Sequence, residues 1–206
     1  MPDFSFEDRL GRKQGKIICG VDEVGRGPLA GPVTAAAVIL PQVFPEAIGA
    51  RIKDSKKLTP TARENLFEPL TQMCRFAIAE SSVEEIDRLN ILGATLLAMQ
   101  RAVAQLGATI DIALIDGNRA PKLACEAVTV IKGDDKSLSI AAASIIAKVH
   151  RDRLMKKLAE EFPFYGWERN AGYGTSEHLA ALAQHGVTAW HRESFAPVRA
   201  AGKRSA

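Results

Sequence analysis

Acidic residues stand at the ends of three apolar segments of this 206-residue chain. IICGV runs directly into Asp22 and Glu23, IALI into Asp116, and VTVIKG into Asp134 and Asp135. Asp is common in turns after strands, so any one of these acids could serve local geometry alone. Three apolar segments that each end in acidic residues favour a shared role for these acids, because ligands of open α/β sheets bind beyond the carboxyl ends of strands.

Four of these acids, Asp22, Glu23, Asp116 and Asp134, would raise each other's pKa values in one small site unless cations neutralised them. Ligands made only of oxygen suit Mg²⁺ or Mn²⁺ rather than zinc. Two such ions roughly 3.5 to 4 Å apart can activate water and stabilise the departing oxygen of a phosphodiester. The acids therefore predict a nuclease that uses two Mg²⁺ or Mn²⁺ ions during catalysis.

A short glycine-rich segment, Gly25-Arg26-Gly27, follows the first acidic pair. Its glycines let the backbone approach a ligand closely, and the arginine offers a planar fork of donors. The chain has no GxxxxGK[ST] loop, and a glycine pair with an arginine is by itself typical of an ordinary turn. Its position beside the acids is what makes it a candidate binding segment.

The acids must be positioned by strands, and five apolar, β-branched runs predict them. These runs are Lys16–Val21, Val33–Leu40, Arg75–Glu80, Ile110–Ile115 and Ala127–Ile131. Two early strands followed by alternating strands and helices indicate an α/β fold, with a mixed sheet flanked by helices.

Helix-capping residues predict where four helices begin. Thr59 before Pro60 opens the first, with a capping box of Thr61 and Glu64 as the alternative start. The Ser82–Glu85 capping box opens a long helix that ends before Gly107. Ser137 opens a third, alanine-rich helix that presents an apolar face for the core: Leu138, Ala142, Ile145 and Val149. The last is capped by Thr175 or Ser176 and ends at Gly186.

The bulk composition fits one ordinary soluble domain. The length predicts a single domain over residues 1–206, with a mobile basic tail from about Ala200. A net charge of +3 fits contact with phosphates without requiring it.

Three scattered cysteines predict neither disulfides nor a zinc site, and no apolar run is long enough to span a membrane. We expect a cytoplasmic protein with no membrane contact.

Several longer motifs together resemble the ribonuclease HII family, the bacterial type 2 ribonucleases H. They are GVDEVGRGPLAGPVTAAAV, DSKKLT, LIDGNRAPKL, IKGDDKS, SIAAASIIAKVHRD and FPFYGWERNAGYGT, which lie in the family's order between about residues 17 and 198. The resemblance implies a ribonuclease H-like mixed sheet with a C-terminal helical extension. It also implies cleavage of the RNA strand of RNA–DNA hybrids and nicking 5′ to ribonucleotides embedded in duplex DNA, leaving 5′-phosphate and 3′-hydroxyl ends.

The resemblance also assigns roles to residues. Asp22, Glu23, Asp116 and Asp134 match the family's metal-binding and catalytic set, and Gly25, Arg26 and Gly27 match its loop for the ribose 2′-hydroxyl. Tyr173 matches the aromatic that packs on the sugar beside an RNA–DNA junction, although a loop aromatic more often fills core. We expect further substrate contacts from Lys53, Ser55, Lys56, Asn118 and Lys148, and the basic residues Lys57, Arg119, Lys122 and Arg151 are also placed to meet phosphates.

Two departures from the family pattern affect these assignments. Asn170-Ala171-Gly172 stands where family members commonly have a basic residue, and Asp135 adds a second acid after Asp134. We expect Asp134 to be catalytic and Asp135 to face elsewhere, as a cap of the next helix. The competing classes are a hydrolase of small phosphates, a ribonuclease HIII and a catalytically silent hybrid-binding module. We expect the active enzyme to be a monomer.

Overall fold

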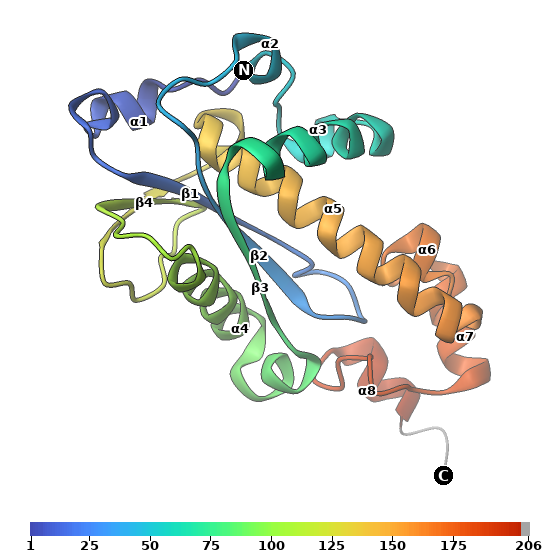
Figure 1. Ribbon diagram of the computed structural model, residues 1–206. Helices are drawn as coiled ribbons and strands as arrows, with labels where there is room; N and C mark the ends of the chain where they lie inside the picture. The colour runs from blue at the N-terminus through green and yellow to red at the C-terminus, as the bar shows by residue number, and fades with distance from the viewer. Residues whose placement is uncertain (203–206) are drawn as a thin grey trace.

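The computed structural model describes residues 1–202, which build a mixed five-stranded sheet with helices on both faces (Figure 1). The strands lie in the order β3-β2-β1-β4-β5. Neighbours pair antiparallel from β3 to β1 and parallel from β1 to β5. Their bounds are β1 Ile18–Val24, β2 Val33–Ile39, β3 Arg75–Ser81, β4 Ile112–Asp116 and β5 Glu126–Val130. The predicted α/β mixed sheet is confirmed.

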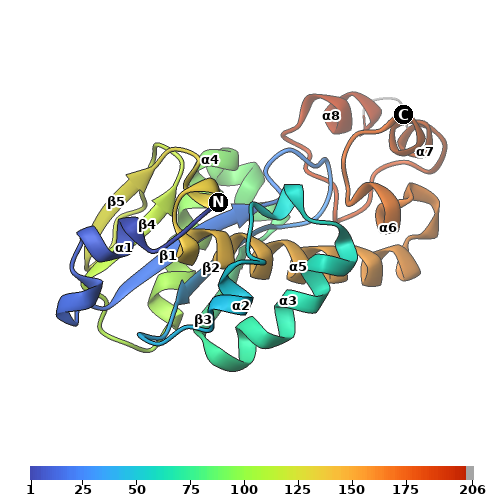
Figure 2. The same ribbon diagram turned by 90° about the horizontal axis from the view of Figure 1, so that it is seen from above.

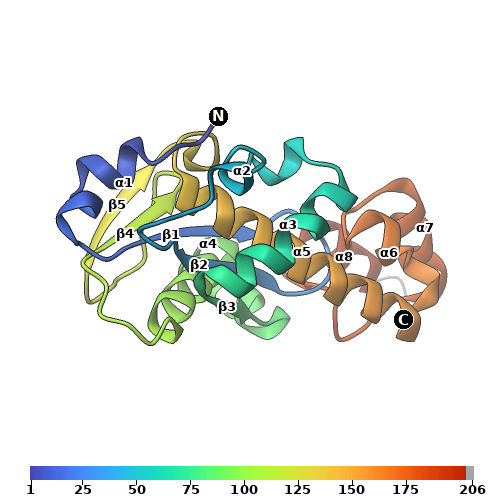
Figure 3. The same ribbon diagram turned by 45° about the horizontal axis from the view of Figure 1, so that its top comes forward.

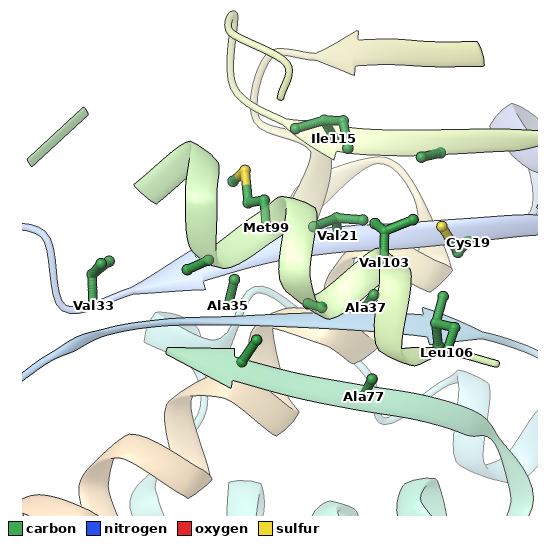
Figure 4. Packing of buried hydrophobic residues seen from close by; sticks show 14 of the residues in the cluster. Cys19, Val21, Val33, Ala35, Ala37, Ala77, Met99, Val103, Leu106 and Ile115 are labelled. Carbon is green, nitrogen blue, oxygen red and sulfur yellow. The ribbon is translucent and has the colours of Figure 1, made fainter. Parts of the chain in front are cut away.

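Three long helices cover the sheet (Figure 2). They are α3 Pro60–Met73, α4 Val83–Gln105 and α5 Leu138–Glu161. Helix α4 packs on one face, against alternate residues of the strands such as Val21, Ala35 and Ala37 (Figure 4). Helices α5 and α3 pack on the other face, against Ala36 and Val38. This alternation follows from the two-residue period of a strand.

The sheet and α5 approach each other closely at Gly20 of β1. A Cβ atom at this position would lie 2.1 Å from the backbone carbon of Ser139, in the first turn of α5. The absence of a side chain at Gly20 lets the two backbones touch. The beginning of α5 is thereby fixed against β1, two residues before Asp22.

The predicted caps form in the structure. Ser82 and Glu85 make the reciprocal capping box of α4, and Thr59, Ser137 and Thr175 each accept a hydrogen bond from a backbone N–H of their helix. Helix α4 is not continuous as predicted, because Asn90 has a φ of 60°. Its side chain accepts from the N–H groups of Leu92 and Gly93, so it caps a new helical segment inside α4.

The C-terminal part forms a separate group of helices at one end of the sheet (Figure 3). It contains α6 Trp167–Asn170, α7 Ser176–His185 and α8 Ala196–Gly202, which pack with the second half of α5 around the buried Trp167. The predicted C-terminal helical extension is present. The tail expected to be mobile from about Ala200 overlaps the end of α8, which reaches Gly202, and residues 203–206 lie outside the described part.

The N-terminal segment is more than the polar start that the sequence indicated. It contains α1 Ser5–Arg9, and a further short helix, α2 Glu46–Gly49, precedes α3. Glu7 is 2% exposed, and its Oε1 accepts from the hydroxyls of Ser137 and Ser139, each at 2.6 Å. This contact ties the N-terminus to the start of α5. None of the helices in residues 1–202 is long and apolar enough to cross a membrane.

Candidate active site

Two parallel strands bring three of the predicted acids together. In the register of β1 and β4, Val21 lies opposite Ile115, so Asp22 and Asp116 leave the two strands at the same end. Carboxylate oxygens of Asp22, Glu23 and Asp116 lie within 4.8 Å of one another. The sequence prediction that separate strands deliver their acids to one place is correct for these three.

Burial and mutual repulsion make it costly for Asp22 and Glu23 to carry their negative charges. Asp22 is 5% exposed, and burial, with the nearby charges of Glu23 and Asp116, holds its pKa well above the usual range. Burial also raises the pKa of Glu23, against the opposing effect of Arg26, whose Nη1 lies 3.3 Å from the Glu23 carboxylate. A bound cation would remove this repulsion.

Asp134 joins the group from a one-turn 3-10 helix, Gly133–Asp135, between β5 and α5. The N–H of Gly133 donates to Oδ1 of Asp116 at 2.6 Å, which fixes this turn beside Asp116. Burial, followed by the charges of Asp116 and Asp54, raises the pKa of Asp134 to about 6. Asp134 therefore interacts electrostatically with Asp116, although its carboxylate is not among the three that lie within 4.8 Å of one another.

Lys56 is a second cation beside these acids, in addition to Arg26. Burial acts to lower its pKa, but the charges of Asp22, Asp134, Asp54 and Asp116 outweigh burial and raise it. The ammonium group therefore stays charged beside the carboxylates. Lys56 and Arg26 together carry fewer charges than these acids, and the oxygen-only donor set fits hard divalent cations such as Mg²⁺ or Mn²⁺.

Asp135 lies outside the group, as predicted. Its carboxylate is exposed and pairs with the ammonium of Lys57. The role expected for it as a helix cap is wrong, because Ser137 caps α5.

These positions predict that Asp134→Asn lowers single-turnover cleavage by roughly tenfold to a hundredfold, whereas Asp135→Asn changes it less than about twofold. Asp134 loses a charge next to Asp116, while Asp135 loses only an exposed ion pair. Rapid-quench assays of the two variants with one RNA–DNA hybrid provide the comparison. Equal losses would show that the adjacent acids share the role.

The glycine-rich loop begins where β1 ends, directly after Val24. Gly25 has a φ of 91°, and a Cβ there would meet Nε of Arg151 at 2.2 Å. A Cβ at Gly27 would lie 3.1 Å from the ring of Tyr173, whose side chain is 49% exposed. Tyr173 is thus not a core aromatic, and it stands beside the loop with an open face.

The other predicted contact residues differ in how exposed they are. Lys53 and Asn118 are exposed, while Lys148 is half-buried and pairs with Asp152 at 2.5 Å. Ser55 is 3% exposed, and its hydroxyl lies 2.8 Å from that of Ser144, so the side chain faces inward. Ser144 in turn donates to Asp22, a contact that lowers the pKa of this acid. The pairing of the two serines joins positions 89 residues apart and has no signal in their spacing.

Arg151, grouped by sequence with the phosphate-binding residues, is instead an internal residue. Its guanidinium is buried and donates to the carbonyls of Ala30, Pro32 and Ala171. Arg192, which no sequence pattern singled out, is buried behind the glycine-rich loop. The run VHRDRLMKK reads as a basic helix face, so only the fold reveals that Arg151 points inward.

Comparison with known proteins identifies the family. The model of the family described as ribonuclease HII matches residues 19–198. The chain belongs to the ribonuclease HII family. It is 56% identical over 209 residues to the ribonuclease HII of Rhodospirillum rubrum, covering 100% of this chain and 94% of that protein. Membership in the ribonuclease HII family makes the chain a ribonuclease H, a hydrolytic endonuclease.

Solved structures agree with this assignment. The ribonuclease H2 of Pyrococcus horikoshii OT3 has a TM-score of 0.76 at 26% identity, covering 91% of this chain and 97% of that chain. The Bst-RNase HIII structure in complex with Mn²⁺ has a TM-score of 0.72 at 20% identity, covering 92% of this chain and 71% of that chain. The second likeness concerns the fold alone.

The departure from the ribonuclease HII pattern at Asn170 has a structural explanation. The amide Nδ2 donates to the carbonyl of Tyr165 at 2.7 Å, and Oδ1 accepts from the N–H of Gly172 at 2.8 Å. These bonds hold a tight turn in which Ala171 and Gly172 both have positive φ. Asn170 therefore shapes the turn that presents Tyr173.

Proposed function

We propose that this ribonuclease H cuts the RNA strand of RNA–DNA hybrids and also nicks duplex DNA on the 5′ side of a single embedded ribonucleotide. The observation that supports this specificity is the contact between Gly27 and Tyr173 beside the acidic group. A loop whose backbone can meet a ribose 2′-hydroxyl stands next to an aromatic ring that can pack on a neighbouring deoxyribose. The enzyme then reads both sides of an RNA–DNA junction.

The chemistry is that of a carboxylate cluster with two divalent ions. Asp22, Glu23, Asp116 and Asp134 would hold Mg²⁺ or Mn²⁺, and the Mn²⁺ complex of a protein with this fold supports that choice. Such ions supply the charge that activates an attacking water and stabilises the departing oxygen. The N–H of Gly133 orients the Asp116 carboxylate, and Lys56 offsets part of the negative charge.

The substrate backbone is bound by residues around the acids. Lys56 is exposed and lies near the acids, and Lys53 and Asn118 are exposed and lie within three residues of Lys56 and Asp116 in the chain. All three can contact phosphates without reading sequence. Lys148 contributes once the duplex competes with Asp152 for its ammonium group. Ser55 acts from inside the protein, through Ser144. The proposed partners are thus RNA–DNA hybrids and ribonucleotide-containing duplex DNA.

The proposed function predicts the outcome of incubating the enzyme and Mg²⁺ with three duplexes of one sequence. We expect cutting of the RNA–DNA hybrid and a single nick 5′ to a lone ribonucleotide, with all-DNA cut at least a hundredfold more slowly. A buried donor left without its hydroxyl partner costs about 1–3 kcal/mol, and a misplaced phosphate adds about a hundredfold in rate.

Denaturing gels of end-labelled strands measure both the rate and the position of each cut. Efficient cutting of all-DNA, or an intact strand at the lone ribonucleotide, would contradict the proposed specificity. Cutting of the hybrid alone would restrict the function to hybrid removal.

A further inference from the structure

The loop from Gly25 to Pro32 is held from inside the protein by two arginines. Arg192, between α7 and α8, is 0% exposed, and Arg151 of α5 is 1% exposed. Across residues 1–202, neither guanidinium forms an ion pair with a carboxylate. Burial lowers the pKa of Arg192 to about 9 and that of Arg151 to about 10. Burying a charge without an acidic partner costs free energy, so the hydrogen bonds of these two guanidinium groups must offset that cost.

Every hydrogen bond from the Arg192 guanidinium goes to a backbone carbonyl of this loop. Nε donates to Gly31 at 2.9 Å; Nη1 donates to Arg26 at 3.0 Å and Pro28 at 2.7 Å; Nη2 donates to Gly25 at 2.5 Å, Gly31 at 2.8 Å and Pro32 at 3.2 Å. Arg151 adds bonds to Ala30 and Pro32. The loop therefore turns its carbonyl oxygens inward.

The inward carbonyls decide where the loop N–H groups point. In a planar trans peptide the C=O and N–H bonds are antiparallel. The carbonyl of Gly25 shares a peptide with the N–H of Arg26, and the carbonyl of Arg26 shares one with the N–H of Gly27. Both N–H groups consequently face away from Arg192, and no hydrogen bond within residues 1–202 uses either of them. The positive charge behind the carbonyls also polarises these peptides, which strengthens the donors.

We propose that Arg192 is a positioning residue for ribose recognition: it orients the peptide planes of Gly25–Gly27 so that the N–H groups of Arg26 and Gly27 donate to a ribose 2′-oxygen. The inference rests on the proposed function, since it concerns the specificity of the same site. A deoxyribose in this position offers no oxygen, so both donors stay unpaired. Arg192 does not contact the substrate. It acts by fixing the orientation of the Arg26 and Gly27 N–H groups, which a flexible loop would not hold.

The test compares Arg192→Lys with Val198→Ala. Lysine keeps the charge but replaces the planar fork by one nitrogen, which cannot span the five carbonyls that arginine reaches. Val198 is buried in the same C-terminal cluster and contacts none of these carbonyls, so its variant reports destabilisation alone. In an Asp116→Asn background, which slows cutting by roughly 10²–10³-fold, fluorescence anisotropy read before the duplex is cut gives the affinities for a one-ribonucleotide duplex and an all-DNA duplex.

We expect Arg192→Lys to lower the affinity ratio of the two duplexes at least tenfold, with unchanged binding of all-DNA. Val198→Ala should keep the ratio while its melting temperature falls. An Arg192→Lys protein that melts early but keeps the ratio would overturn the proposal. If the unmodified enzyme fails to nick at a lone ribonucleotide, the proposed function fails instead, and the two failures are therefore distinguishable.

Amide hydrogen exchange provides a measurement that does not require Arg192→Lys to fold. With Arg192 intact, the N–H groups of Arg26 and Gly27 should exchange rapidly in the free Asp116→Asn protein. They should become at least tenfold more protected with the one-ribonucleotide duplex and not with all-DNA. Strong protection in the free protein, or equal protection by both duplexes, would show that these groups do not read the 2′-oxygen.

Discussion

Asp116→Asn is expected to lower single-turnover cleavage of an RNA–DNA hybrid by roughly 10²–10³-fold, the loss typical when one electrostatic stabiliser of a transition state is removed. Asp116 connects two parts of the site. Its carboxylate lies close to those of Asp22 and Glu23, and it accepts a hydrogen bond from the N–H of Gly133. The amide oxygen of asparagine can keep the last bond but not the charge. The loss should therefore appear in turnover and in metal binding, not in folding.

Melting curves separate these effects. Without metal, Asp116→Asn should melt no lower than the unmodified protein, because the Asp116 charge adds to the repulsion that raises the pKa values of Asp22 and Asp134. Mg²⁺ should raise the melting temperature of the unmodified protein by mass action, and that of the variant much less. Asp135→Asn is the matched control and should behave like the unmodified protein in both assays. A folded Asp116→Asn protein with normal turnover would contradict the assignment of the site.

The largest effect on stability is expected from Gly20→Ala. The new methyl group would lie 2.1 Å from the Ser139 carbonyl carbon, and a backbone atom cannot rotate aside as a side chain can. We expect the free energy of unfolding to fall by more than about 3 kcal/mol, the upper end for an overpacked core. For a chain of this size that corresponds to a melting temperature lower by roughly 6–12 °C.

Gly93→Ala is the matched control, because Gly93 lies in α4 and the nearest atom to an added methyl is the Leu89 Cβ at 3.2 Å. Alanine is the better helix former by about 1 kcal/mol, so this variant should melt at or above the original temperature. Thermal unfolding by circular dichroism compares the two. A Gly20→Ala protein as stable as Gly93→Ala would mean that α5 moves away from β1 without cost.

The elements of the fold were predictable because their signals are local. Ser82 with Glu85, Thr59 with Pro60, and alternating apolar residues each act within a few positions of the chain. The acids could be predicted as a group because parallel strands bring their ends together, which is a property of the topology. The kink at Asn90 was not predicted, because an asparagine inside an apolar helical pattern can either continue the helix or begin a new one. Tertiary packing decides between the two.

The supporting residues could not be predicted because their partners are remote. Glu7 contacts Ser139 from 132 positions away, and Arg192 contacts Gly25 from 167 positions away. A buried arginine that serves backbone carbonyls has the same appearance in a sequence as an exposed one. The inward face of Ser55 and the internal role of Arg151 were missed for this reason.

The span between Arg192 and Gly25 also sets the order in which the enzyme is completed during synthesis. A chain emerges from its N-terminus, so the loop and all four acids are made before Arg192. A nascent chain can then pair β1 with β4 and assemble the carboxylates while the loop carbonyls still lack their guanidinium. With the roles proposed above for the acids and for Arg192, metal binding would become possible earlier during synthesis than selection of the substrate.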